Sequence, residues 1–459
     1  MTDTRPNVLF VVADDHRFSS LGTCGVEPVR TPTLDALAEG GTRFQRAHMM
    51  GGLQPAVCVP TRASLMTGMN PFRAAAGHDL QDYANQQTLH PDWQTLPGVF
   101  REAGYRTFIT GKWHNDKASL QRSFTEGDSI FLGGMHHDPY AAAVHPFDLT
   151  GAYPQDAAEP TGVHATERFC TSAARFVTEA AADDQPWFAY MAFTSPHDPR
   201  IAPPPFADQY DPDAIELPPN AWPEHPFDNG ELTVRDERLA AHPRLPDEVR
   251  RHIADYYAMV SHLDAELGRV VAALRDTGQL ERTIIVYTSD HGLGVGQHGL
   301  LGKQNLYDHS VRVPLIMAGP GVPRGRVVEP IVWSASVYPT LCDVCNLTTP
   351  DNVEAPSLVP HFTGSADGAP ATMFSLYRDL QRMVSDSQWK LIRYHRGADG
   401  RGTEREQLFH LADDPWEIND LIDDPAHRAQ RDRLSAELTR WQQRVGDPLL
   451  DARTAPPGA

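Results

Sequence analysis

The sequence lacks any apolar run of about 20 residues, the length that a membrane span requires. The N-terminus, MTDTRPNVLF, also lacks a basic segment followed by a long apolar stretch. We therefore expect a cytoplasmic protein without a membrane partner, unless a leader has been removed. Cysteine is scarce and odd in number, with residues at 24, 58, 170, 342 and 345. This scattered set does not predict a disulfide framework and favours a reducing compartment.

Positive charge is also in short supply. The chain of 459 residues has 40 Lys and Arg against 60 Asp and Glu, a formal net charge of −20. With no basic run to offset it, this charge argues against a nucleic-acid partner. The only lysines are Lys112, Lys117, Lys303 and Lys390, so a lysine beside suspected chemistry points to a need for its compact ammonium group. The sequence does not indicate an oligomeric state.

What the sequence has is an alternation of strand and helix patterns. Apolar, β-branched runs predict buried strands at 7–13, 105–110, 186–194, 282–289 and 313–319. Amphipathic helical patterns lie between them, the longest at 249–278. The alternation predicts an α/β fold with a large, mixed but mostly parallel sheet sandwiched by helices.

From about residue 370 the pattern changes to short antiparallel strands and one amphipathic helix. This change predicts a smaller C-terminal α+β subdomain at 366–459, after an N-terminal α/β domain at 1–365.

Polar motifs follow four of the predicted strands. They are DDHR at 14–17, GKWHND at 111–116, SPHDPR at 195–200 and DHG at 290–292. Because ligands bind at the carboxyl ends of strands in open α/β sheets, we expect these motifs to meet at one edge.

The acidic members of these motifs predict a metal site. Asp14 and Asp15 end one strand and Asp290 ends another, and such carboxylates repel one another unless a cation lies between them. Hard oxygen ligands favour Ca²⁺ or Mg²⁺, and His291 could add an imidazole nitrogen. The alternative for an isolated Asp pair is a helix cap or a hydrated loop.

The basic members of these motifs predict an anion cradle. Lys112, His114, His197 and Lys303 supply positive charge and groups that transfer protons. A tetrahedral oxyanion requires such a cradle. A single histidine is more often a surface or core residue, but a group of four is harder to explain in that way.

Cys58 stands in CVPTRASLMTG at 58–68, where Pro60 predicts a helix start and Arg62 lies about one turn further on. The C-x-P-x-R motif in this setting resembles the sulfatase family of the alkaline phosphatase superfamily. The resemblance runs from NVLFVVADD to LFHLADDPWEINDL, and GKWH and GKQNLYDHSVRVP are also similar to the family. In that family a dedicated formylglycine-generating enzyme oxidises this cysteine to formylglycine.

The resemblance implies a metal site and a set of catalytic roles. The implied metal ligands are Asp14, Asp15, Asp290 and His291 together with modified Cys58. The ion is most often Ca²⁺ in the family, with Mg²⁺ or Mn²⁺ as alternatives, and many members carry Asn where this chain has His291.

By the same resemblance, Arg62 and Lys112 steady the hydrated aldehyde. Lys303 and His197 hold the sulfate and help the leaving oxygen depart, and His114 acts as a base on the intermediate. One hydroxyl of the aldehyde hydrate attacks sulfur, and the other then collapses to the aldehyde and ejects sulfate.

The implied function is hydrolysis of a sulfate ester of a sugar or small molecule. The first alternative is a phosphomonoesterase, phosphodiesterase or phosphonate hydrolase of the same superfamily. The second alternative is a binding protein that never acquires the modification.

Two further motifs have simpler interpretations. CDVC at 342–345 has no second cysteine pair for a zinc site and predicts core packing on a helix. The glycine-rich loop at 131–140, which carries His136, His137 and Asp138, is either a surface loop or part of the substrate pocket.

Overall fold

A mixed sheet organises the fold, which a computed structural model describes for residues 5–77, 86–364 and 371–450. Strand β1 (Asn7–Asp14) is central and pairs in parallel with β8 (Trp187–Pro196) and β9 (Thr283–Ser289). β8 continues in parallel to β4 (Arg106–Lys112) and then β5 (Glu126–Phe131). Beyond β9 lie strands of mixed direction: β11 (Leu315–Ala318), β2 (Gly41–His48), β10 (Arg312–Val313) and β12 (Arg326–Trp333).

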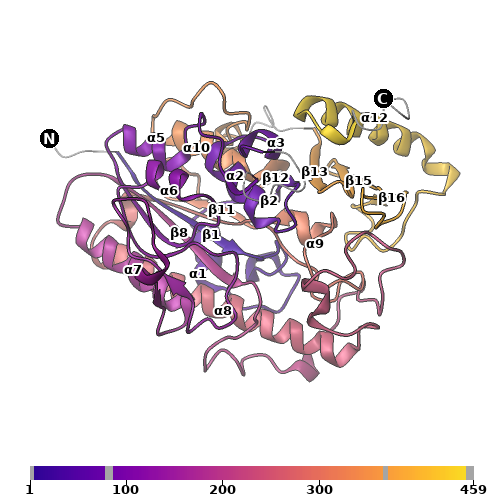
Figure 1. The fold of residues 1–459 in the computed structure, drawn as a ribbon, viewed down its shortest axis with the longest axis horizontal. Helices are drawn as coiled ribbons and strands as arrows, with labels where there is room; N and C mark the ends of the chain where they lie inside the picture. Colours follow the sequence, from indigo (N-terminus) through magenta and orange to yellow (C-terminus); the bar gives the residue numbers. More distant parts are fainter. Residues whose placement is uncertain (1–4, 78–85, 365–370, 451–459) are drawn as a thin grey trace.

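Helices cover both faces of this sheet (Figure 1), and the central strand β1 is therefore buried on both faces. Val8, Phe10 and Val12 point into one hydrophobic core, and Leu9 and Val11 point into the other. Side chains alternate along a strand, so a strand between two helical layers must be apolar throughout. One layer has α1 (Pro32–Glu39), α7 (Ala165–Ala180) and α8 (Pro246–Asp276). The other has α2 (Cys58–Thr67), α5 (Leu96–Glu102), α6 (Lys117–Ser123) and α10 (Val337–Val344).

The α/β sandwich expected from the sequence is therefore confirmed. All five predicted strands are present, within about two residues of their expected bounds. The sequence analysis did not identify β2, β5 or β12. Their sequences GTRFQRAH, EGDSIF and RVVEPIVW mix polar with apolar residues, and parts of each are incompletely buried.

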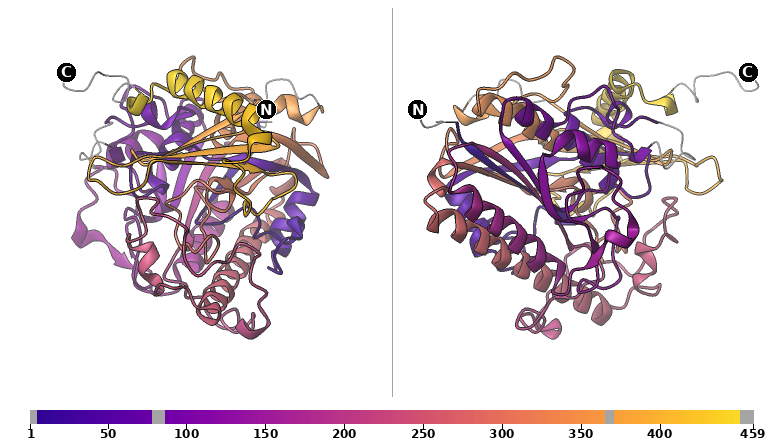
Figure 2. Two further views of the ribbon diagram at one scale, coloured as in Figure 1. Left: turned by 90° about the vertical axis from the view of Figure 1, so that its right-hand side faces the viewer. Right: turned by 60° about the vertical axis from the view of Figure 1, so that its left-hand side comes forward.

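A second sheet and a helix form the expected C-terminal α+β part. The strands β13 (Met373–Tyr377), β14 (Gln381–Ser385), β15 (Trp389–Tyr394) and β16 (Arg405–His410) are antiparallel. Figure 2 shows α12 (Arg428–Val445) lying across this sheet. The sheet also takes in β3 (Gly51–Gly52), which pairs with β13. The boundary between residues 365 and 366 stays a prediction, because 365–370 lie outside the described residues.

The described chain also has short α-helices and strands, α3 (Pro71–Ala74), α9 (Asp308–Val311), α11 (Val359–Phe362), β6 (Ala143–Val144) and β7 (Glu159–Pro160), and several short 3-10 helices. Within the described ranges, every helix is too short or too polar to span a lipid bilayer.

Candidate active site

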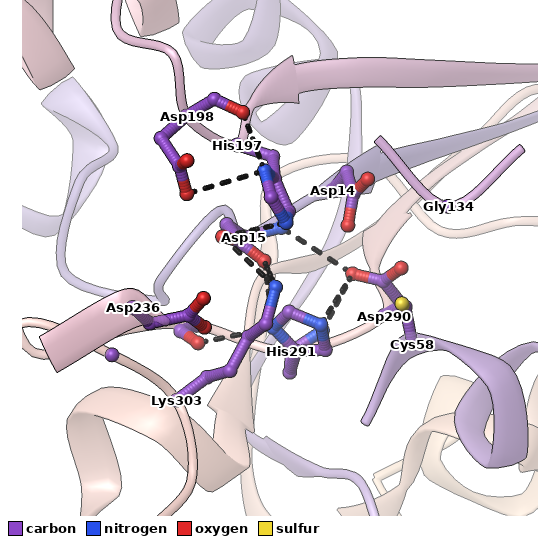
Figure 3. Close-up of polar contacts among 12 residues, drawn as sticks. Asp14, Asp15, Cys58, Gly134, His197, Asp198, Asp236, Asp290, His291 and Lys303 are labelled. Atoms are coloured by element: carbon purple, nitrogen blue, oxygen red, sulfur yellow. Dashed lines mark hydrogen bonds and ion pairs between the residues drawn. The ribbon is translucent and has the colours of Figure 1, made fainter. Parts of the chain in front are cut away.

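The four polar motifs do lie together at the carboxyl edge of the large sheet, and Figure 3 shows residues of three of them. Asp14 ends β1 and Lys112 ends β4, while His197 directly follows β8 and Asp290 directly follows β9. Asp15 has a left-handed φ of 72°, so the chain turns sharply there. Such a backbone costs a non-glycine residue about 1 kcal/mol or more, and the surrounding structure must hold it in place.

Cys58 is the first residue of α2, and its side chain points into this cluster. It is 2% exposed, and its Sγ lies 3.1 Å from His114 Nδ1 and 3.7 Å from Lys112 Nζ. Burial raises the pKa of the thiol, but Lys112 and His114 outweigh it and bring the pKa of Cys58 well below its usual range. Burial also lowers the pKa of His114, which favours a neutral ring that can accept a proton.

Two buried cations neutralise the carboxylates around Cys58. Lys112 Nζ donates to Asp14 Oδ2 at 2.5 Å, and Arg62 Nε donates to Asp290 Oδ2 at 2.9 Å. Burial opposes ionisation of Asp14, but Lys112 and His197 hold the pKa of that carboxyl well below its usual range. Burial, together with the charge of Asp14, raises the pKa of Asp290 to about 6.

Ligand-type atoms of Asp14, Cys58, Asp290 and His291 all lie within 4.8 Å of one another and are buried. Asp14 Oδ1 and His291 Nε2 have no hydrogen-bond partner among the described residues. Buried polar atoms are normally satisfied, so these two atoms fit a group that binds between them. A divalent cation fits this donor set, in which two carboxylates and an imidazole converge.

Asp15 borders this cluster and lies between His197 and Lys303 (Figure 3). Lys303 Nζ donates to Asp15 Oδ1 at 2.9 Å, and His197 Nε2 lies 4.0 Å from Asp15 Oδ2. Asp15 Oδ1 also lies 3.1 Å from His291 Nδ1, which connects it to the other acidic groups. The ten residues that the sequence analysis named as metal ligands or catalytic groups are thus all buried in this region.

The sequence analysis missed several contributors to this site. The Gly134 carbonyl accepts from Lys112 Nζ at 2.5 Å, and Tyr190 Oη accepts from Arg62 Nη1 at 3.2 Å. A Cβ at position 134 would lie 2.7 Å from His114 Nε2, so a larger residue there would displace the His114 ring. Asp198 and Arg235 lie behind His197, as described below. The glycine pair in the loop was the one signal that could have identified Gly134.

The structure places the CDVC motif and the loop at 131–140 in different surroundings. Cys342 and Cys345 are at most 3% exposed in a hydrophobic core, as core packing predicts, and burial raises the pKa of each to about 12. The loop at 131–140 reaches the site through Gly134, and His136 Nε2 lies 2.9 Å from Thr194 Oγ1. His137 and Asp138 of the same loop are exposed.

A buried cluster of carboxylates and cations at the carboxyl edge of a helix-covered sheet is typical of a metal-dependent hydrolase with an alkaline-phosphatase-like fold. The family profile for sulfatases matches residues 6–347, and the profile of the N-sulphoglucosamine sulphohydrolase C-terminal region matches residues 296–444. The chain therefore belongs to the sulfatase family, and it is a hydrolase of sulfate esters.

Curated relatives agree with this assignment, and solved structures share the fold. An ulvan-active sulfatase of Formosa agariphila is 26% identical over 97% of this chain and 82% of its own length. A choline-sulfatase of Rhizobium meliloti is 27% identical over 98% of this chain and 90% of its own length. A solved complex with D-glucosamine-2-N,6-O-disulfate has a TM-score of 0.80 at 20% identity, covering 96% of this chain and 98% of the other. The phosphonate monoester hydrolase of Agrobacterium radiobacter has a TM-score of 0.72 at 23% identity, covering 96% of each chain.

Proposed function

We propose that the protein cleaves the sulfate ester of a sugar or small molecule through a formylglycine formed from Cys58. The observation that carries this proposal is the position of Cys58, whose buried Sγ lies among Asp14, Asp290 and His291 and 3.7 Å from Lys112 Nζ. A hydrated formylglycine supplies an oxygen nucleophile and a second hydroxyl through which sulfate can be released.

Asp14, Asp290 and His291 would hold a divalent cation beside this residue, with Asp15 at its border. The ion we propose is Ca²⁺, with Mg²⁺ or Mn²⁺ as alternatives, and it would supply positive charge next to the attacking oxygen. The single imidazole among carboxylates favours a test of all three ions rather than Ca²⁺ alone.

The remaining side chains have separate roles in the proposal. Arg62 and Lys112 fix the carboxylates and the side chain at position 58. His114, 3.1 Å from Cys58 Sγ, is placed to accept a proton from that side chain. His197 and Lys303 flank Asp15, where they would bind the sulfate and protonate the leaving oxygen.

The first test is a mass spectrum of the Cys58 peptide from protein made together with a formylglycine-generating enzyme. Conversion of Cys58 removes about 18 Da. The converted enzyme is then assayed on sulfated monosaccharides, choline sulfate and an aryl sulfate. The variant C58A should lose nearly all turnover, while C170A, which changes a cysteine buried in α7, should retain it. Full turnover by protein with an unmodified Cys58 thiol would overturn the proposed nucleophile.

The alternative activity is tested in the same assay. A sulfate monoester, a phosphonate monoester and a phosphodiester of one phenol share the leaving group, so their kcat/KM values compare the transferred group alone. We expect the sulfate ester to have the highest value. A preference for the phosphonate would instead support the activity named for the phosphonate hydrolase neighbour.

A further inference from the structure

A chain of hydrogen bonds connects the two groups proposed to handle sulfate. At one end, His197 Nδ1 donates to the Asp198 backbone carbonyl at 2.7 Å. Because a carbonyl can only accept, this contact places a proton on Nδ1 and directs Nε2 toward the site. The Asp198 carboxylate lies close to the same nitrogen, with Oδ1 at 3.4 Å from Nδ1.

At the other end, the chain reaches the backbone of Lys303. Asp236 Oδ2 accepts from Gln304 Nε2 at 2.8 Å, and Gln304 Oε1 accepts from the Lys303 amide at 3.0 Å. Lys303 and Gln304 belong to the loop after β9, whereas His197 and Asp198 belong to the loop after β8. Asp15 contacts the side chains of both His197 and Lys303, and a second connection between the two loops runs behind these side chains.

Arg235 joins the two halves. Its guanidinium binds both oxygens of Asp198, through Nη1 and through Nη2 at 2.9 Å, and Nη2 also contacts Asp236 Oδ1 at 2.7 Å. Asp198 and Asp236 are 6% and 7% exposed, while the Arg235 side chain is 38% exposed. The guanidinium therefore extends from the protein surface to two buried carboxylates. Its planar fork suits this double contact, which a lysine ammonium cannot reproduce.

We propose that Arg235 is a positioning residue that holds His197 and Lys303 at a fixed separation across the sulfate-binding side of the site. This inference rests on the roles proposed above for these two residues. Arg235 also keeps the Asp198 carboxylate occupied. Without Arg235, the segment of His197 would lose its ion pairs to Asp236 and hence its tie to the Lys303 segment, and the ring would be held less firmly toward the leaving oxygen.

The test compares R235M with R235K and with R238A, which removes an exposed arginine three residues further along. Each variant is assayed on aryl sulfates whose phenols range from acidic nitrophenols to unsubstituted phenol. We expect R235M to lower kcat by about 10- to 100-fold, the usual loss when a supporting contact is removed. The loss should grow as the phenol becomes less acidic, because poor leaving groups depend most on protonation. R235K should recover only part of the rate, and R238A should stay within about twofold of wild type.

A second variant makes the result independent of how R235M folds. D198N keeps the backbone carbonyl and the size of the side chain but weakens the contact with Arg235. If both act through this contact, D198N shows the same leaving-group trend, and the double variant loses little more than either single one. Equal losses for all phenols, a change in KM alone or additive effects would overturn the proposal. Failure of the proposed function is distinct, since wild-type enzyme with converted Cys58 would then turn over no sulfate ester.

Discussion

The tie between the C-terminal sheet and the catalytic sheet can be tested by the substitution K390M. Lys390 lies on β15 and is fully buried, with its Nζ in contact with Asp308 Oδ1 and 2.6 Å from Glu417 Oε1. Glu417 Oε2 in turn accepts from the Asp308 amide at 2.7 Å. Asp308 begins α9, at the end of the segment that carries Lys303. Loss of the ammonium would leave two buried carboxylates without their shared cation.

The expected cost follows from this arrangement. Removing one partner of a buried ion pair costs about 3–5 kcal/mol. Burial raises the pKa of Glu417 to about 7 even with Lys390 beside it, so below pH 7 the glutamate is largely protonated and the loss is smaller. Above pH 7 the wild-type Glu417 ionises and pairs with Lys390, whereas in K390M it must stay protonated. The cost of the substitution therefore grows by about 1.36 kcal/mol per pH unit. We therefore expect K390M to cost about 3 kcal/mol at pH 6 and about 4 kcal/mol at pH 8.

Urea and thermal unfolding at the two pH values measure this difference. With an unfolding entropy of about 2.1 cal/mol/K per residue, a chain of 459 residues loses about 1 °C of Tm per kcal/mol. The control K117M, which changes an exposed lysine, should cost less than about 1 kcal/mol. The double variant K390M/E417Q should regain stability and lose the pH dependence. An equal cost of K390M at both pH values, or no gain in the double variant, would refute the reasoning.

Three further predictions concern the site and the fold. Removal of metal by a chelator should abolish sulfate ester hydrolysis, and an ion restored at 100 times its Kd should add about 2.7 kcal/mol of stability; elemental analysis and thermal melts check both. R62K should lower kcat/KM by about 10- to 100-fold in steady-state kinetics, because lysine cannot reach Asp290, the Lys112 carbonyl and Tyr190 together. Burial raises the pKa of Asp264 to about 6, so the folded protein favours the protonated form of this carboxyl. Its contribution to stability is fully present below about pH 4 and is lost as the pH rises through 6. D264N should lack this loss, and urea unfolding should show its stability relative to wild type rising by about 3 kcal/mol between pH 4 and pH 7.

The strands that carry the site were predictable because a single physical requirement determines the pattern of their sequences. A strand between two helical layers must be apolar on both faces, and its first polar residue marks the edge of the sheet. Asp14 and Asp290 follow such runs directly. β2 gave no such signal, because its arginines and Gln45 are only partly buried.

Arg235 illustrates what periodicity cannot predict. It lies between long proline-rich and irregular segments, and only the tertiary structure brings it to Asp198. Nothing in the local pattern distinguishes it from the exposed Arg238. The groups proposed to carry out the chemistry could be found at strand ends. Arg235, which we propose aligns two of them, comes from a loop whose path the sequence does not encode in a simple repeat.

The second sheet helps to support the segment that leads to Cys58. β13 pairs with Gly51 and Gly52, the second of which is six residues before Cys58, and the Arg378 amide donates to the Gly52 carbonyl at 2.9 Å. Gly51 has a φ of 77°, and a Cβ there would lie 2.2 Å from the Leu376 carbonyl. A Cβ at Gly52 would lie 2.4 Å from Pro60 of the C-x-P-x-R motif. The glycines let the second sheet and the start of α2 approach closely, so the C-terminal part of the chain helps to fix where the side chain at position 58 enters the site.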